Sequence, residues 1–266
     1  MPARSADEAR RLVETDILLG VGEIPLVHLD QLGDHEPAPE VADEPASAPG
    51  VAATVLPRVA PRAPSGDRAA ALEHLRERHD LECPHCTRVK THTRTVFGEG
   101  SAHAQIFFVG EAPGETEDQV GRPFVGRAGQ KLDEMIKAMG LTREVCYIAN
   151  VLKSRPPNNR TPLPAEIAMC SPYLVEQILI VQPKVLVPLG GPATQLLLRV
   201  DTGITKLRGQ WTVWTPPEGS PIGPIPVMPT FHPAYLLRNY TVQTRSEVWS
   251  DLKAVMDRLA RVAASA

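Results

Sequence analysis

A glycine-rich, acidic loop between a predicted strand and a predicted helix constrains the fold of this chain most strongly. Residues 106–109 (IFFV) form a short apolar run, which is typical of a strand buried on both faces of a parallel sheet. Leu132, Met135 and Ile136 recur at helical spacing further along. Gly140 follows at a position where helices often end. The loop therefore leaves the carboxyl end of a strand, where open α/β sheets bind their ligands.

The composition of this loop favours a neutral, flat ligand. Residues 110–129 (GEAPGETEDQVGRPFVGRAG) contain five glycines, together with Glu111, Glu117 and Asp118. The glycine spacings match neither the dinucleotide-binding nor the P-loop motif, and the P-loop lysine is missing. Carboxylates at the loop would also repel phosphate. A nucleobase held against Phe124 fits these residues.

Polar residues also follow other predicted strands. Asn150 ends a β-rich run at 146–151 (CYIANV), and residues 153–160 (KSRPPNNR) then form a basic, proline-stiffened loop. Residues 184–190 (KVLVPLG) predict another buried strand, and His232 follows a last short one. We therefore expect a three-layer α/β/α fold with a short, mainly parallel central sheet and one site at one of its edges.

The first 70 residues differ from the rest of the chain. They hold 12 acidic and 6 basic residues, whereas residues 71–266 are mildly basic, which is compatible with nucleic-acid binding. Seven prolines among residues 37–66 predict a disordered linker, and residues 7–19 predict a short helix. We expect an acidic, Pro/Ala-rich flexible leader over 1–70 and a single globular domain over 71–266, acting as a monomer.

The chain shows no signal peptide and no expected membrane span, and its four cysteines do not form a secreted disulfide framework. These features predict a cytoplasmic, nucleoid-associated protein. Cys83 and Cys86 form a C-x-x-C pair that can direct two thiolates at one metal ion or cluster. A redox dithiol is the alternative, but the preceding helix follows no strand.

Five ordered motifs together resemble the family 4 uracil-DNA glycosylases, the iron–sulfur branch of the uracil-DNA glycosylase superfamily. The resemblance covers about residues 70–260. The motifs are residues 110–118, 121–129, 148–153, 155–160 and 232–237.

The resemblance implies a role for each pocket residue. Phe124 would stack on a flipped uracil, and Asn150 would read its polar edge. Glu117 would exclude the 5-methyl group of thymine. His232 would donate to uracil O2 as negative charge develops, with help from the backbone at Gly110. Glu111 is the candidate for positioning the attacking water; its alternative role is to cap the loop backbone.

The resemblance also implies a DNA-binding surface. Apolar side chains would fill the gap left by the flipped base, and basic ones would contact phosphates. The residues for the wedge are Tyr235, Leu236 and Leu237, and those for the phosphates are Arg238, Arg155, Arg160 and Lys153.

A structural [4Fe–4S] cluster is implied as well, but one ligand position departs from the family pattern. Cys83, Cys86 and Cys170 match family cysteines, whereas Ser154 stands where the third cysteine belongs. Three possibilities remain open: a serine-ligated cluster, a cluster with water or another side chain, and a zinc or metal-free remnant. Cys146 lies eight residues from Ser154, more than about 20 Å along an extended strand, and is interpreted as a core residue.

The implied function is hydrolysis of the uracil N-glycosidic bond in DNA, which initiates base excision repair. No Schiff-base lyase step is expected. The rival hypotheses are a non-catalytic module that binds uracil or damaged DNA, and a DNA-polymerase accessory protein. Repair or replication proteins are the expected partners of the leader.

Overall fold

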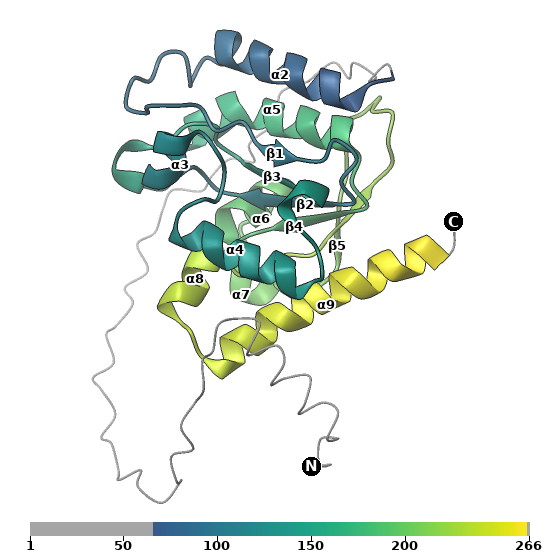
Figure 1. Ribbon diagram of the computed structural model, residues 1–266. Helices are drawn as coiled ribbons and strands as arrows, with labels where there is room; N and C mark the ends of the chain where they lie inside the picture. The colour runs from purple at the N-terminus through teal and green to yellow at the C-terminus, as the bar shows by residue number, and fades with distance from the viewer. Residues whose placement is uncertain (1–65, 265–266) are drawn as a thin grey trace, which may run out of the picture. The chain divides into compact units, whose positions relative to one another are not determined.

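The computed structural model describes residues 66–264 (Figure 1). The predicted leader, its short helix and its partners therefore lie outside the described residues, apart from residues 66–70. The first described helix, α2 (Arg68–Glu82), begins three residues before the predicted domain boundary. The Asp67 side chain caps it by accepting from the backbone N–H groups of Ala69 and Ala70.

A six-stranded, mainly parallel sheet forms the centre of the domain, in the order β1-β3-β2-β4-β6-β5. The four inner strands run parallel, and the two outer strands pair antiparallel at the edges. The strands are β1 (Glu99–Gly100), β2 (Ile106–Gly110), β3 (Tyr147–Asn150), β4 (Val185–Pro188), β5 (Thr212–Trp214) and β6 (Ile225–Val227).

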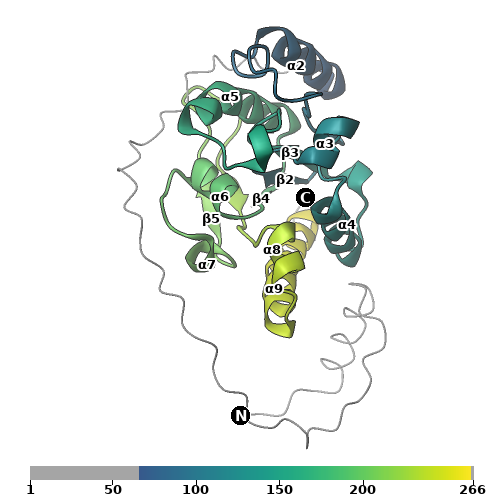
Figure 2. The ribbon, with the colours of Figure 1, turned by 90° about the vertical axis from the view of Figure 1, so that its left-hand side faces the viewer.

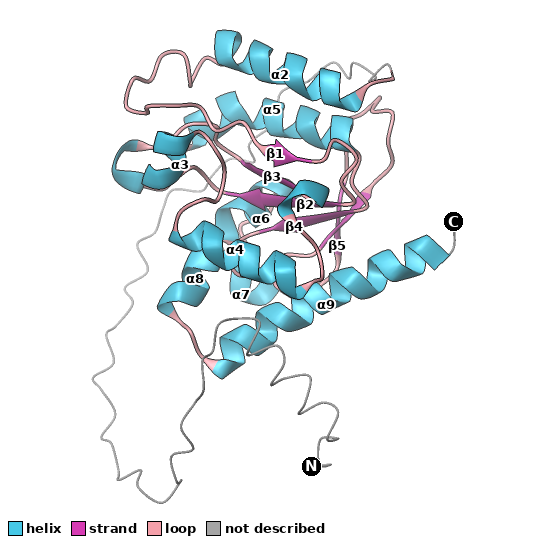
Figure 3. Cartoon of the chain, viewed as in Figure 1, coloured by secondary structure: helices cyan, strands magenta, loops and turns pink. Residues whose placement is uncertain are grey.

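Helices cover both faces of this sheet, so that three layers are visible (Figures 2 and 3). One layer contains α2, α5 (Pro164–Val181) and α6 (Gly191–Leu198), and the other contains α4 (Arg127–Ala138), α8 (Pro233–Arg238) and α9 (Val242–Ala264). Shorter helices connect these elements: α3 (Glu115–Val120), α7 (Ile204–Leu207) and the 3-10 turns η2 (Arg143–Val145) and η3 (Pro157–Asn159). The predicted α/β/α architecture is confirmed.

Strand β2 contributes side chains to two apolar cores, one on each face of the sheet. Phe107 and Val109 belong to the cluster under α2, α5 and α6, whereas Ile106 and Phe108 belong to the cluster under α4, α8 and α9. Alternate residues of a strand point to opposite faces, so an uninterrupted apolar run supplies both cores. The prediction of a strand buried on both faces is confirmed.

Helix α5 is long and apolar enough to cross a membrane by length and composition, but 61% of it is buried inside this fold. It packs between α2 and the sheet, and that position accounts for its hydropathy. After α7 the chain forms an antiparallel pair of strands, β5 and β6, at one edge of the sheet.

Candidate active site

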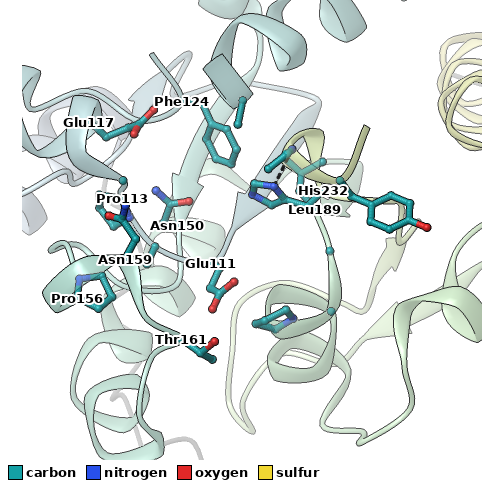
Figure 4. Close-up of a pocket in the computed structure, with 18 of the residues that line it drawn as sticks. Glu111, Pro113, Glu117, Phe124, Asn150, Pro156, Asn159, Thr161, Leu189 and His232 are labelled. Atoms are coloured by element: carbon teal, nitrogen blue, oxygen red, sulfur yellow. Dashed lines mark hydrogen bonds between the residues drawn. The ribbon is translucent and has the colours of Figure 1, made fainter. Parts of the chain in front are cut away.

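A cavity of about 630 Å³ opens at the carboxyl edge of the parallel strands. Its walls come from residues that end or follow four strands: Asn150 ends β3, Glu111 and Leu189 come directly after β2 and β4, and His232 lies in the loop after β6. Strand β2 lies between β3 and β4, so the chain order reverses at this point, and such switch points form ligand crevices in open α/β sheets. The structure thus brings the predicted pocket residues together (Figure 4).

Gly110 is required here because two pocket side chains occupy the space beside its Cα. A Cβ at Gly110 would lie 2.2 Å from Asn150 Oδ1 and 2.4 Å from Phe124 Cζ. Both distances are far below van der Waals contact. Glycine therefore allows the amide and the ring to approach each other at the floor of the pocket.

The Phe124 ring is held by a strained backbone. Its φ of 52° lies in the left-handed region, which a bulky residue rarely adopts. The Glu117 carboxylate stabilises the following turn, because its Oε1 accepts from the N–H groups of Val125 and Gly126 at 2.9 and 2.7 Å. Glu117 lines the cavity, as predicted, but its carboxylate also organises the loop that carries the ring.

Arg143 is a second support for this loop, and no sequence motif identifies it. Its guanidinium donates to the carbonyl oxygens of Phe124 and Pro123 at 2.9 and 2.6 Å. Glu99 and Asp133 hold the same guanidinium through ion pairs. An arginine that binds two consecutive carbonyls fixes the backbone around Phe124.

Asn150 presents an unsatisfied hydrogen-bonding atom to the pocket. The residue is 1% exposed, and its Oδ1 has no hydrogen-bond partner. A buried acceptor without a partner costs about 1–3 kcal/mol, and a ligand that donates a hydrogen bond there recovers it. The amide is therefore prepared for a ligand N–H group.

The hydrogen bonding of His232 determines which ring nitrogen carries the proton. Nδ1 accepts from the backbone N–H of Ala234 at 3.1 Å, so in the neutral ring the proton resides on Nε2. Burial lowers the pKa of His232 to about 4, and the charge of Arg238 lowers it further. The ring centroid lies 5.7 Å from that of Phe124. His232 is thus a neutral donor beside the stacking ring.

Glu111 points into the cavity from the side opposite Phe124 (Figure 4). Burial raises the pKa of its carboxyl group. A carboxylate in this position can accept a hydrogen bond from a water molecule and take up its proton.

The predicted DNA-binding residues divide into two groups. Tyr235 and Arg238 line the mouth of the cavity, as does Arg160, which makes a bidentate ion pair with Glu166. Arg155 donates to Asn159 Oδ1 at 2.7 Å beside the same wall. Three of these four residues line the cavity, and Arg155 contacts a fourth lining residue, Asn159.

Two predicted DNA contacts are wrong. Leu236 is 1% exposed and packs in the core under α8, so it is not available as a wedge. Lys153 is fully buried: its Nζ donates to the Asn150 carbonyl and to Gln177 Oε1, and phosphate cannot reach it. None of the described residues that line the cavity is a lysine.

The three predicted metal ligands meet on the other side of Lys153. Cys170 Sγ lies 3.7 Å from Cys83 Sγ and 3.5 Å from Cys86 Sγ, and all three side chains are buried. Cys146 belongs to the opposite core, and burial raises the pKa of its thiol to about 11, which disfavours a thiolate ligand. The soft sulfur donors suit an iron–sulfur cluster or zinc.

A fourth donor residue that the sequence analysis missed joins this group. A ring nitrogen of His79 and the three Cys Sγ atoms all lie within 4.8 Å of one another. His79 precedes Cys83 by one helical turn on α2, so their side chains share a face. The spacing His-x-x-x-Cys-x-x-Cys was the available signal.

An α/β/α fold with a cavity at the carboxyl edge of its sheet is typical of α/β enzymes. Comparison of the sequence with known proteins identifies the family. The sequence profile described as the Uracil DNA glycosylase superfamily matches residues 97–253, more than half of the chain. The chain therefore belongs to the uracil-DNA glycosylase superfamily.

Within this superfamily, the chain is similar to several Type-4 uracil-DNA glycosylases. The Type-4 uracil-DNA glycosylase of Thermotoga maritima is 47% identical over 175 residues, which cover 65% of this chain and 86% of the relative. The Type-4 enzyme of Sulfurisphaera tokodaii is 44% identical over 192 residues, covering 70% and 84%. That of Archaeoglobus fulgidus is 42% identical over 182 residues, covering 67% and 88%.

Proposed function

We propose that this chain is a monofunctional uracil-DNA glycosylase, which removes uracil from DNA and leaves an abasic site. The observation that carries this proposal is the convergence of an unpartnered buried amide oxygen at Asn150, a neutral imidazole donor at His232 and an aromatic ring at Phe124 in one cavity. Similarity to Type-4 uracil-DNA glycosylases supports the same conclusion.

The pocket recognises uracil through Phe124 and Asn150. Extruding a base from the duplex costs a few kcal/mol, which stacking on the Phe124 ring and hydrogen bonds in the pocket offset. Asn150 Oδ1 accepts from uracil N3–H, and its amide nitrogen donates to O4. Cytosine presents an acceptor at N3 and a donor at C4, so both Asn150 groups would lose their partners.

His232 and Glu111 are placed to assist cleavage of the N-glycosidic bond. The bond between C1′ and N1 breaks with its electron pair moving to the uracil, and His232 Nε2–H stabilises the charge that gathers on O2. Water attacks C1′, forming the new C–O bond, and passes a proton to the Glu111 carboxylate. The uracil anion is protonated after release, and Glu111 returns its proton to solvent.

The test is a duplex with one uracil, compared with matched duplexes that carry cytosine or thymine at the same position. Multiple turnovers that release free uracil and leave an alkali-sensitive abasic site would support the proposal. Tight binding without base release would instead support a damage-binding or polymerase-accessory role.

The cysteine group holds a structural metal centre in this proposal. A [4Fe–4S] cluster is supported by the family resemblance and by the soft thiolate donors. The cluster would tie the end of α2 and the loop that follows it to α5, and it would supply no chemistry to the pocket. A single zinc ion is the second candidate, favoured by the sulfur separations of 3.5 and 3.7 Å. A tetrahedral ion with bonds of about 2.3 Å separates its sulfurs by roughly 3.8 Å.

Iron, inorganic sulfide and zinc analysis of protein purified without oxygen separates the two candidates. Iron and sulfide in equal amounts support the cluster. Zinc at one equivalent without sulfide supports the single ion.

A further inference from the structure

Ser154 stands where the family pattern has a cysteine, so the fourth ligand of the metal centre must be identified. Ser154 Oγ lies 3.4 Å from Cys86 Sγ and is fully buried, so the serine is close to the centre. A serine hydroxyl is a hard donor that must lose a proton from a weakly acidic group before it binds a metal strongly. Soft centres that thiolates hold prefer sulfur or imidazole nitrogen.

His79 offers such a nitrogen beside the three thiols. The residue is fully buried, and its Nε2 has no hydrogen-bond partner. A buried ring nitrogen without a hydrogen-bond partner costs free energy and therefore calls for a structural explanation. Its closeness to the three thiols supplies a reason, because an imidazole lone pair directed at a metal is no longer unsatisfied.

Asp80 fixes the orientation that such a ligand needs. His79 Nδ1 lies 2.9 Å from Asp80 Oδ1, and Thr95 Oγ1 donates to the same carboxylate oxygen at 2.9 Å. A proton on Nδ1, donated to the carboxylate, leaves Nε2 as the free lone pair. Histidine ligands of metals commonly carry this carboxylate partner, which sets the tautomer and raises ligand basicity.

We propose that His79 Nε2 is the fourth ligand, so that one imidazole and three thiolates hold the metal centre while Ser154 stays outside the coordination. Once Cys86 is bound as a thiolate it carries no proton, and the Ser154 hydroxyl becomes the donor to its sulfur. Cys3His is an established zinc donor set, and imidazole also replaces thiolate at some iron–sulfur clusters. The inference therefore holds for either metal and does not depend on uracil excision.

The experiment measures metal content and the rate of metal loss to a chelator, in protein purified without oxygen. His79→Ala should lose metal at least about tenfold faster than the unaltered chain, and Asp80→Asn should weaken retention by roughly 10–100-fold. Ser154→Ala should retain metal nearly as well as the unaltered chain. Retention by His79→Ala together with loss in Ser154→Ala would overturn the proposal in favour of serine ligation.

Three controls isolate the coordination effect. His74→Ala removes an exposed histidine from the same helix, and His85→Ala removes a buried histidine that also has an unpartnered Nε2 but lies outside the donor group. Cys146→Ala removes the cysteine of the opposite core. All three should keep their metal. Loss in His85→Ala equal to that in His79→Ala would contradict the assignment.

A rescue variant keeps the test decisive if His79→Ala folds poorly. The double variant His79→Ala/Ser154→Cys replaces the imidazole with a fourth thiolate and should recover metal retention. Substitution with Co²⁺ in a zinc form, or the reduction potential of an iron–sulfur form, should then report the change from nitrogen to sulfur. Identical spectra or potentials for the unaltered chain and the double variant would show that His79 was never a ligand.

Discussion

Lys153 Nζ donates a hydrogen bond to the backbone carbonyl of Asn150 at 2.8 Å. The same ammonium group reaches Gln177 Oε1 on α5 at 2.5 Å and lies close to the cysteine group, whose charges raise its pKa against a larger lowering by burial. Lys153 therefore connects Asn150, the residue proposed to read the base, with the layer that contains the cysteine group. A residue predicted to bind phosphate instead belongs to the interior of the domain.

Lys153→Met should destabilise the protein, because it leaves the Asn150 carbonyl and Gln177 Oε1 without their donor. The expected loss is about 1–3 kcal/mol in the free energy of unfolding, measured with denaturant. Uracil excision should fall as well, since the end of β3 carries Asn150, whose amide is proposed to read the base. Lys137→Met, at an exposed position on α4, is the control and should change neither property. Unaltered stability in Lys153→Met would contradict this structural role.

Arg143→Ala should slow excision indirectly, because Arg143 does not line the cavity but holds the backbone around Phe124. The change frees the carbonyls of Pro123 and Phe124, so the strained backbone can relax and the ring can leave its stacking position. We expect kcat to fall by at least about tenfold, an effect that corresponds to roughly 1.4 kcal/mol. Arg143→Lys should restore part of the loss. Single-turnover rates equal to those of the unaltered chain would show that Arg143 does not position Phe124.

The pH dependence of stability should reveal the lowered pKa of His232. The folded pKa of His232 is about 4, below its ordinary value of 6.5, so between these values the unfolded chain binds a proton that the folded chain does not. The stabilising contribution of this group is complete above pH 6.5 and is lost as the pH falls toward 4. His232→Gln should therefore lose less stability than the unaltered chain between pH 7 and pH 5. An NMR titration midpoint near 6.5 for His232 would contradict the lowered pKa and the neutral ring.

Activity should respond to a different group. His232 stays neutral across pH 5–8 and keeps its Nε2 proton, so it should not shape the profile there. Burial raises the pKa of Glu111, and excision should therefore decline as the pH falls through a value above the ordinary 4.5 of a glutamate. Glu111→Gln should have a low rate and should lose this acid limb. An unchanged limb in that variant would assign the titration to another residue.

Substitution of Glu117 should relax the rejection of thymine and also loosen the pocket. Removing the side chain in Glu117→Ala opens the space beside uracil C5, and a methyl group is worth only about 1–3 kcal/mol in such a pocket. The same change removes the acceptor for Val125 and Gly126, so uracil excision should fall too. Glu117→Gln keeps one amide oxygen and is the matched control. A Glu117→Ala variant that excises uracil normally and releases no thymine would contradict the exclusion role.

The sequence predicted the architecture because the strongest signals were local. Residues 106–109 are apolar at every position, which requires two covered faces, and the helical spacing that follows fixes the next element. Residues that follow successive parallel strands share one edge of the sheet, so Asn150 and His232 could be placed together without a structure.

The sequence did not reveal contacts between distant segments. Lys153 and Leu236 occur in motifs next to functional residues, but tertiary packing buries both. Arg143 acts on a loop some twenty residues earlier, and no spacing rule connects them. His79 supplies a donor beside Cys170 only because α2 packs on α5. In each case the sequence does not show which residue, distant along the chain, the side chain contacts in the folded protein.

The central claim is that uracil is excised in the cavity lined by Asn150 and His232. The most direct test measures uracil release by Asn150→Ala and His232→Ala in single turnovers on a duplex with one uracil. Both contacts strengthen as the glycosidic bond breaks, so each variant should be slower by about 10²–10³-fold while its melting temperature and metal content remain close to those of the unaltered chain. His103→Ala, an exposed histidine before β2, should behave like the unaltered chain. Normal rates of uracil release in both Asn150→Ala and His232→Ala would show that this cavity is not where the bond is cleaved.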